Sequence, residues 1–244
     1  LHIFTALLGF IASRGIILEN LMPFGLCLVG GCTSVFLPSI AAGAFVGYFI
    51  PAIGNGGFRY IAALFAVIAI RLLLSGYKKI SENPLFLGLI TMLANAFTGA
   101  VTYSGIPLDA LKLTAESLII FAAVIITHKT FLSLSRRNCG LNYDELACIL
   151  VTASVVLTGL SNFTVFGVSV GKTAGVFLIL AAAKYGGITS GSICGIVVSF
   201  CAAITGAFEG GFGIYALIGL SAGMFGVLGK YAQCAAAVAS GIIG

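Results

Sequence analysis

The stretch Pro107–Thr127, with the sequence PLDALKLTAESLIIFAAVIIT, decides the fold class because it reads as one membrane-spanning helix. A helix needs about 20 mainly apolar residues to cross a hydrocarbon core about 30 Å thick, and this stretch is long enough. Pro107 suits the first helical turn, where a missing backbone N–H is tolerated, and Asp109 suits the positive end of the helix dipole. We therefore predict a transmembrane helix that begins at Pro107.

Glu116 puts a carboxylate part-way along this predicted helix. It lies about 13 Å from Pro107 at a rise of about 1.5 Å per residue, near the middle of the hydrocarbon core. A charge at that depth costs about 2.5 to 3.5 kcal/mol on insertion scales, so we expect Glu116 to face other helices and to have a partner. Lys112, one turn earlier, is a candidate ion-pair partner, and Asn95 on the preceding span is a candidate hydrogen-bond partner.

The composition of the whole chain agrees with a membrane protein. The chain has 244 residues, of which 60% are hydrophobic and 8% are charged, and its mean hydropathy is +1.17. Soluble domains carry about 25% charged residues. The apolar runs are continuous, whereas a membrane β-barrel would show alternating polarity. The net charge of +5 is explained by cytoplasmic loops, and we expect no nucleic-acid partner.

The five prolines and the charged clusters separate the apolar runs into about ten transmembrane helices. We predict an all-α, polytopic membrane bundle that forms a single transmembrane domain over residues 1–244. The predicted spans are 1–18, 21–37, 38–53, 58–75, 84–103, 107–127, 143–161, 165–184, 187–206 and 212–229. The second and third are short for a core of about 30 Å, so we expect them to be tilted or partly re-entrant. A further helix is expected to begin near Tyr231.

The distribution of lysine and arginine predicts the orientation, because cytoplasmic loops carry an excess of both. With a cytoplasmic N-terminus, the residues inside are Arg71, Lys78, Lys79, Lys129, Arg136, Arg137, Lys184 and Lys230. The residues outside are Arg14, Arg59, Lys112 and Lys172. This asymmetry predicts that both termini and the loop from Leu132 to Glu145 are cytoplasmic.

Small residues recur every four positions at Gly187, Gly191 and Gly195, and the pattern continues with Ser199 and Ala203. Such a series lets a neighbouring helix approach closely. The same spacing occurs in three glycine pairs, Gly43 with Gly47, Gly171 with Gly175, and Gly219 with Gly223. The pattern predicts tight packing. It favours packing within the chain, and self-association stays open as the alternative.

The sequence contains no motif that supports catalysis, a cofactor site or a metal site in this segment. The seven cysteines form no CxxC pair and read as small core residues, and the two histidines, His2 and His128, are too scattered for a metal site. Residues 167–173, GVSVGKT, are one residue short of a phosphate-binding loop and follow no predicted strand. No hydrolase elbow, zinc helix, kinase set or dinucleotide fingerprint occurs.

Four polar residues, Asn95, Lys112, Glu116 and Asn162, are candidates for a polar path through the bundle. One interpretation is a proton or solute site, which would make the chain a small-molecule or ion transporter. The other is a buried, hydrogen-bonded cluster that fixes helix packing. The sequence favours the packing interpretation.

Several stretches resemble one family. Residues 7–31, LLGFIASRGIILENLMPFGLCLVGG, are similar to the first helix pair of the stage II sporulation protein E family. The residues that match there are Gly9, Arg14, Pro23 and Phe24. Residues 111–127 resemble the sixth span of that family, whose mid-helix glutamate corresponds to Glu116. Residues 142–162 and the glycine-rich region 183–229 also fit, so the resemblance covers most of the chain.

The resemblance implies an N-terminal membrane region of about ten spans, in the bacterial cell membrane and at the polar division septum. In that family a cytoplasmic region follows that links to the tubulin-like division protein FtsZ. A PP2C-type serine phosphatase domain, with manganese or magnesium, then dephosphorylates an anti-anti-sigma factor and so activates the forespore sigma factor. That domain lies outside these residues, so no catalytic, cofactor or metal residue is carried over. We expect the segment to serve as anchor, septal localiser and oligomerisation unit.

The ends of the sequence support an expectation that the chain is a piece of a longer protein. It begins at Leu1 without a methionine, and it stops at Gly244 inside an apolar run. The expected function therefore depends on a continuation that would carry the phosphatase, whereas a transporter needs none.

Overall fold

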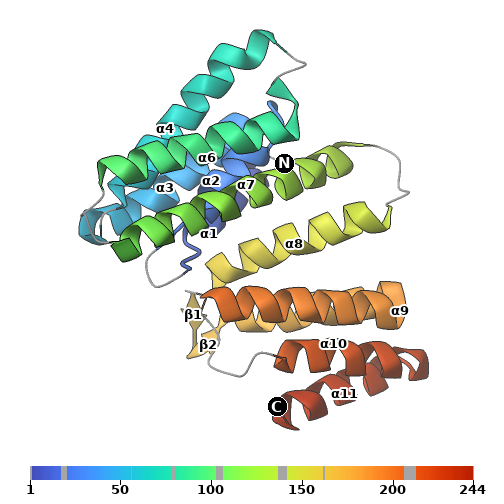
Figure 1. Ribbon diagram of the computed structural model, residues 1–244. Coiled ribbons are helices and arrows are strands. Elements are labelled where there is room, and N and C mark those ends of the chain that lie inside the picture. The colour runs from blue at the N-terminus through green and yellow to red at the C-terminus, as the bar shows by residue number, and fades with distance from the viewer. Residues whose placement is uncertain are drawn as a thin grey trace. The chain divides into compact units, whose positions relative to one another are not determined.

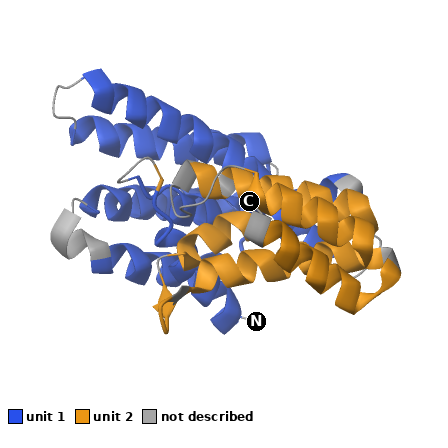
Figure 2. Cartoon of the chain, turned by 90° about the horizontal axis from the view of Figure 1, so that it is seen from below, with its two compact units in different colours: residues 1–16, 20–152 blue, residues 17–19, 153–244 orange. Residues whose placement is uncertain are grey.

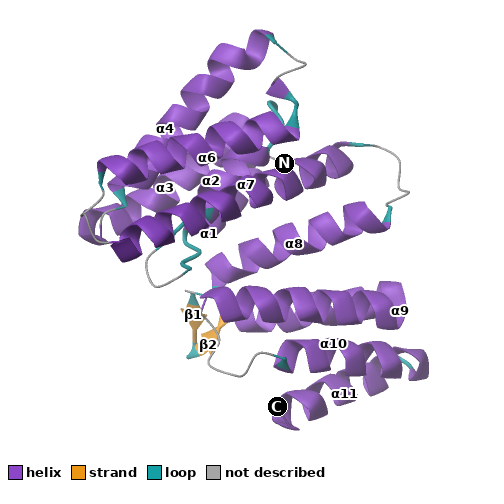
Figure 3. Ribbon diagram, viewed as in Figure 1, coloured by secondary structure: helices purple, strands orange, loops and turns teal. Residues whose placement is uncertain are grey.

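The structure, a computed structural model, describes residues 2–17, 21–55, 57–77, 81–102, 107–136, 142–161, 163–205 and 213–243. These residues contain ten α-helices, two short 3-10 helices and one two-stranded β-hairpin (Figure 1). Colouring by secondary structure shows how little of the described chain is not helical (Figure 3). The predicted all-α class is confirmed.

The chain forms two compact units (Figure 2). Unit 1 comprises Leu1–Ile16 and Asn20–Thr152, and unit 2 comprises Ile17–Glu19 and Ala153–Gly244. The helices that begin in unit 1 are α1 (His2–Ser13), α2 (Phe24–Gly31), α3 (Leu37–Asn55), α4 (Phe58–Leu73), η1 (Leu74–Gly76), α6 (Pro84–Val101), α7 (Pro107–Ser135) and α8 (Tyr143–Leu160). Unit 2 contains β1 (Thr164–Val165), β2 (Val168–Ser169), α9 (Val170–Thr205), α10 (Ile214–Phe225), η2 (Gly226–Leu228) and α11 (Lys230–Ile243).

Helix α7 begins at Pro107, as predicted, but it is longer than the predicted span 107–127. It runs for 29 residues to Ser135, or about 43 Å at the rise of an α-helix. Residues 128–135 are more polar, yet they include neither proline nor glycine, so nothing in them ends the helix. Hydropathy therefore placed the end too early, and the last turns of α7 lie beyond the apolar stretch.

Helix α2 is much shorter than the predicted span over residues 21–37, which was expected to be tilted or partly re-entrant. The helix has eight residues and is about 12 Å long, too short to cross a core of about 30 Å. All eight residues are buried, and α2 contacts α1, α3, α4, α6 and α7. A short helix of this kind is tolerated at membrane depth only where the surrounding protein satisfies its backbone. Unit 1 is therefore built around α2.

Helices α1 and α3 touch at their backbones. A Cβ atom added at Gly43 would meet the carbonyl oxygen of Ala6, and one at Gly47 would lie 2.7 Å from the carbonyl oxygen of Phe10. The predicted Gly43–Gly47 pair thus packs within the chain. Both contacts advance along the two helices together, so α1 and α3 run parallel.

Helices α6 and α7 lie side by side (Figure 1) and run antiparallel. A Cβ atom at Gly88 would lie 3.0 Å from the ring of Phe121, whereas one at Gly99, further along α6, would meet the side chain of Leu113, earlier on α7. Asn83 caps the start of α6, because its side-chain oxygen accepts a hydrogen bond from the Leu85 N–H at 3.1 Å.

Helix α9 reverses direction at Gly187, where φ is 68° and ψ is −155°, a conformation available to glycine. A Cβ atom at Gly175 would lie 3.4 Å from Val198, although these residues would be about 34 Å apart in a straight helix. Residues 170–186 and 188–205 therefore form an antiparallel hairpin. Its turn lies at the predicted boundary between spans 165–184 and 187–206.

The predicted series of small residues packs within unit 2, with one correction. A Cβ atom at Gly191 would lie 2.8 Å from the carbonyl oxygen of Gly219 on α10, and one at Gly195 would meet the carbonyl oxygen of Tyr215. Gly187 does not take part, because it forms the turn and a Cβ atom there would have nothing within 4 Å. Gly191 and Gly195 therefore lie against α10 of the same chain.

Four stretches of the described residues are long and apolar enough to cross a membrane. They are Phe58–Gly76, Pro84–Val101, Pro107–Ser135 and Val170–Phe200. The last contains the reversal at Gly187. Helix α11 begins at Lys230, close to the expected start near Tyr231. The chain is thus a helical membrane protein, and ten separate spans are more than these lengths establish.

Candidate functional site

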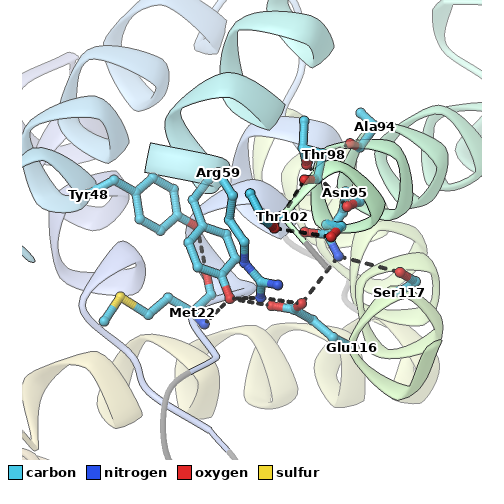
Figure 4. Close-up of polar contacts among 11 residues, drawn as sticks. Met22, Tyr48, Arg59, Ala94, Asn95, Thr98, Thr102, Glu116 and Ser117 are labelled. Atoms are coloured by element: carbon cyan, nitrogen blue, oxygen red, sulfur yellow. Dashed lines mark hydrogen bonds and ion pairs between the residues drawn. The ribbon is translucent and has the colours of Figure 1, made fainter. Parts of the chain in front are cut away.

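Glu116 lies on α7 with its side chain fully buried, and its carboxylate receives three hydrogen bonds (Figure 4). Arg59 donates to Oε2 at 2.7 Å, Tyr60 donates its hydroxyl hydrogen to Oε1 at 2.6 Å, and Asn95 donates to Oε2 at 3.3 Å. A carboxylate only accepts hydrogen bonds, so three donors suit it. The protein itself thus replaces the water that a buried charge loses.

The donors come from two other helices of unit 1. Arg59 and Tyr60 form the first turn of α4, and Asn95 lies in the middle of α6, where it is 1% exposed. The Arg59 guanidinium also donates to the Tyr60 hydroxyl and lies 4.4 Å from the centre of the Tyr60 ring. A cation at that distance over an aromatic face is attracted to the ring, which fixes Arg59 beside the carboxylate.

Tyr60 and Tyr48 connect this cluster to the start of α2. Their rings are stacked, with centroids 5.3 Å apart. The Tyr60 hydroxyl accepts from the Met22 N–H at 2.9 Å, and the Tyr48 hydroxyl donates to the Met22 carbonyl at 2.7 Å and accepts from the Leu26 N–H at 3.0 Å. Each hydroxyl therefore donates once and accepts at least once.

These contacts provide a hydrogen-bond acceptor for a backbone amide at the N-terminus of α2. The first amides of a helix have no partner within the helix, and Pro23, the capping residue, provides no side-chain hydrogen bond. The Tyr48 hydroxyl takes that role for Leu26. Gly25 makes room for it, because a Cβ atom at Gly25 would lie 2.6 Å from the Tyr48 oxygen. We call Tyr48, Arg59, Tyr60, Asn95 and Glu116 the Glu116 cluster.

The structure brings together part of the set expected from the sequence. The expected contact between Asn95 and Glu116 is present. The ion pair of Glu116 comes from Arg59, whereas Lys112, the expected candidate, lies half-buried one turn earlier on α7. Asn162 lies outside the described residues. Arg14 lies half-buried in the turn after α1.

Arg59, Tyr60 and Tyr48 were missed by sequence reasoning, although a signal for Arg59 existed. Arg59 is the second residue of the predicted span 58–75, and Glu116 is the one acid in the middle of any predicted span. Because a buried Glu116 needs a cation as its partner, Arg59 could have been considered as well as Lys112. Nothing in the sequence indicates that the two tyrosines pack beside it.

The fold and the cluster define a helical membrane domain whose central polar residues join helices to one another. Over residues 2–243 the chain matches the family described as SpoIIE, N-terminal domain, and it therefore belongs to that family. The resemblance noted in the sequence is confirmed. No curated protein and no solved structure matches the chain.

Proposed function

We propose that this domain is the membrane-anchoring, septum-localising and self-assembling region of a PP2C-type sporulation phosphatase that activates the forespore sigma factor. The family match over residues 2–243 supports the sporulation role, and the apolar helices support the membrane location. The observation that carries the anchoring role is that Glu116 is buried and hydrogen-bonded to other helices. Its side chain is fully buried, and three protein donors from α4 and α6 bind its carboxylate, so the cluster joins three helices of unit 1.

The proposal includes about ten spans with both termini on the cytoplasmic side. Helix directions in unit 1 support it. Helices α7 and α8 run antiparallel, because Thr130 lies 2.9 Å from Thr152 and Arg136 lies 3.0 Å from Glu145. The parallel pair α1 and α3 and the antiparallel pair α6 and α7 also fit a chain that alternates in direction with each crossing. In this arrangement the division protein FtsZ would be met through a cytoplasmic region after residue 244.

The residues that follow Gly244 provide the simplest test. A long soluble continuation with spaced Asp-Gly motifs, which would supply the manganese or magnesium ligands of the phosphatase, is the expected result. A stop codon within a few dozen codons would overturn the proposal. In sporulating cells, a fluorescent full-length protein with Glu116→Gln should still reach the septum, and Glu116→Ala should accumulate less in the membrane. Glu145→Gln is the matched control, since its partner Arg136 is 68% exposed.

A second candidate function, transport of a small molecule or ion, is favoured by α2. Many transporters use short, interrupted helices whose ends lie beside a buried polar site. Uptake into vesicles that contain the purified protein distinguishes the two candidates. A transporter would take up solute and would lose uptake in Glu116→Gln while still folding. An anchoring domain shows no uptake that depends on Glu116.

A further inference from the structure

The C-terminus of α2 has a buried polar cluster of its own. Arg71, from the last turn of α4, is 6% exposed and donates to the carbonyl oxygens of Val29 at 2.6 Å and Cys32 at 2.7 Å. His128, from α7, is 2% exposed, and its Nδ1 lies 3.1 Å from the carbonyl oxygen of Gly31. A carbonyl oxygen only accepts, so Nδ1 carries the hydrogen in this contact. We call Arg71 and His128 the Arg71 cluster.

Together these contacts satisfy the end of α2 without water. The last four carbonyl groups of a helix have no partner within it. In α2 the carbonyl oxygen of Leu28 accepts from the Cys32 N–H at 2.9 Å. Arg71 donates to the carbonyl oxygens of Val29 and, at 3.4 Å, Gly30, and His128 donates to that of Gly31. The positive charge of Arg71 also suits the negative end of the helix dipole.

The same two helices hold both ends of α2. Helix α4 supplies Arg59 and its neighbour Tyr60 near the start of α2 and Arg71 at the end, and α7 supplies Glu116 and His128. In each helix the two positions are twelve residues apart, which spans about 18 Å. Helices α2, α4 and α7 therefore run in the same direction.

The sides of α2 leave little room for movement. A Cβ atom at Gly30 would lie 2.9 Å from Val124, and one at Gly31 would meet the hydroxyl oxygen of Thr127. The Thr127 hydroxyl also lies 3.1 Å from the carbonyl oxygen of Cys27. Since hydrogen bonds are lost beyond about 3.5 Å, a slide of α2 by a fraction of a helical turn would break the contacts at both of its ends.

We propose that α2 couples the Glu116 cluster to the Arg71 cluster, so that the contacts at its two ends form and open together. A rigid eight-residue helix transmits an axial shift from one end to the other, and packed helices change between discrete arrangements. A displacement of Arg59 or Tyr60 at the start of α4 is thereby transmitted through α2 to Arg71 at the end of α4. The chain continues from there to Tyr77. The coupling is a conformational device within unit 1, separate from anchoring or assembly.

Cys32 reports on this coupling, because it is fully buried at the Arg71 cluster. The experiment uses the full-length protein in membranes, with Cys32 as its one cysteine and a small, membrane-permeant maleimide as the probe. Tyr48→Phe removes one hydroxyl at the opposite end of α2 and keeps the ring. We expect Cys32 to react several-fold faster in this variant. Tyr77→Phe makes the same change at an exposed tyrosine and should leave the rate unchanged.

Two further variants serve as a reference for full release and as a control for general loosening. Arg71→Met opens the near end directly and gives the rate expected for full release. A chain whose one cysteine is Cys194, buried in unit 2, should stay unreactive with Tyr48→Phe, and a rise there would mean general loosening and would contradict the coupling. An unchanged Cys32 rate in Tyr48→Phe, with or without a lower melting temperature, would show that the two ends of α2 act independently.

Discussion

At the scale of single residues, Glu116 shows how a carboxylate is kept within a membrane domain. Two of its three donors, Arg59 and Tyr60, lie 57 and 56 positions before Glu116 in the sequence. Removing one partner of a buried ion pair is costly because it leaves the other charge uncompensated. The effect of a substitution at Glu116 therefore depends on what remains for Arg59, Tyr60 and Asn95.

Glu116→Leu should destabilise the domain far more than Glu116→Gln. Leucine removes every acceptor and leaves the Arg59 guanidinium, 17% exposed, without its anion, at a cost of about 3 to 5 kcal/mol. Glutamine keeps the shape and one acceptor oxygen, so we expect a loss of about 1 to 3 kcal/mol. Thermal unfolding in detergent measures both. Adding Arg59→Met to Glu116→Leu should recover part of the loss, and equal melting temperatures for the two single variants would contradict the assignment.

Gly25→Ala should lower the melting temperature, because the added methyl group would lie 2.6 Å from the Tyr48 hydroxyl oxygen. Overpacking a buried site costs about 1 to 3 kcal/mol, and here it also displaces the hydroxyl that caps α2. Gly76→Ala is the matched control, since a Cβ atom there would have nothing within 4 Å. If both variants melt at the parent temperature, Tyr48 does not depend on the absence of a side chain at Gly25.

At the scale of helices, the sequence predicted the first residues of helices better than their last residues or the contacts between helices. Pro84 and Pro107 begin helices in the structure, as their chemistry requires. The end of α7 was missed because hydropathy marks where a helix leaves the apolar core, whereas helix formation continues through polar residues. The short length of α2 was missed because nothing in an apolar sequence distinguishes a span from a buried helix of eight residues whose ends bind side chains of other helices.

Gly191→Leu should separate the α9 hairpin from α10. The Gly191 Cβ position lies 2.8 Å from both the Gly219 carbonyl oxygen and the Ala183 Cβ atom, so a leucine must displace backbone. We expect a lower melting temperature in detergent. Gly241→Leu adds the same side chain at an exposed position with its nearest neighbour at 3.7 Å and should change little. Equal melting temperatures for the two variants would mean that α10 moves aside at no cost.

At the scale of the whole molecule, composition and hydropathy were sufficient to predict a helical membrane domain, and short motifs were sufficient to predict the family. The Glu116–Asn95 contact could be predicted because adjacent spans are joined by a short loop. The contacts of Tyr48, Tyr60 and Arg71 could not, because they depend on the packing of helices that are distant in sequence. Direction in the membrane rests on the distribution of lysine and arginine and remains a prediction.

The orientation predicts that Cys139, which lies outside the described residues, is on the cytoplasmic side. The longest loop and eight of the twelve basic residues lie inside when the N-terminus is cytoplasmic. In intact cells carrying a chain whose one cysteine is Cys139, an impermeant maleimide should give no labelling, and a permeant one should label. A chain whose one cysteine is introduced by Ser104→Cys, before Pro107, serves as the matched control and should react with both reagents. Labelling of Cys139 by the impermeant reagent, with Ser104→Cys protected, would reverse the orientation and place both termini outside.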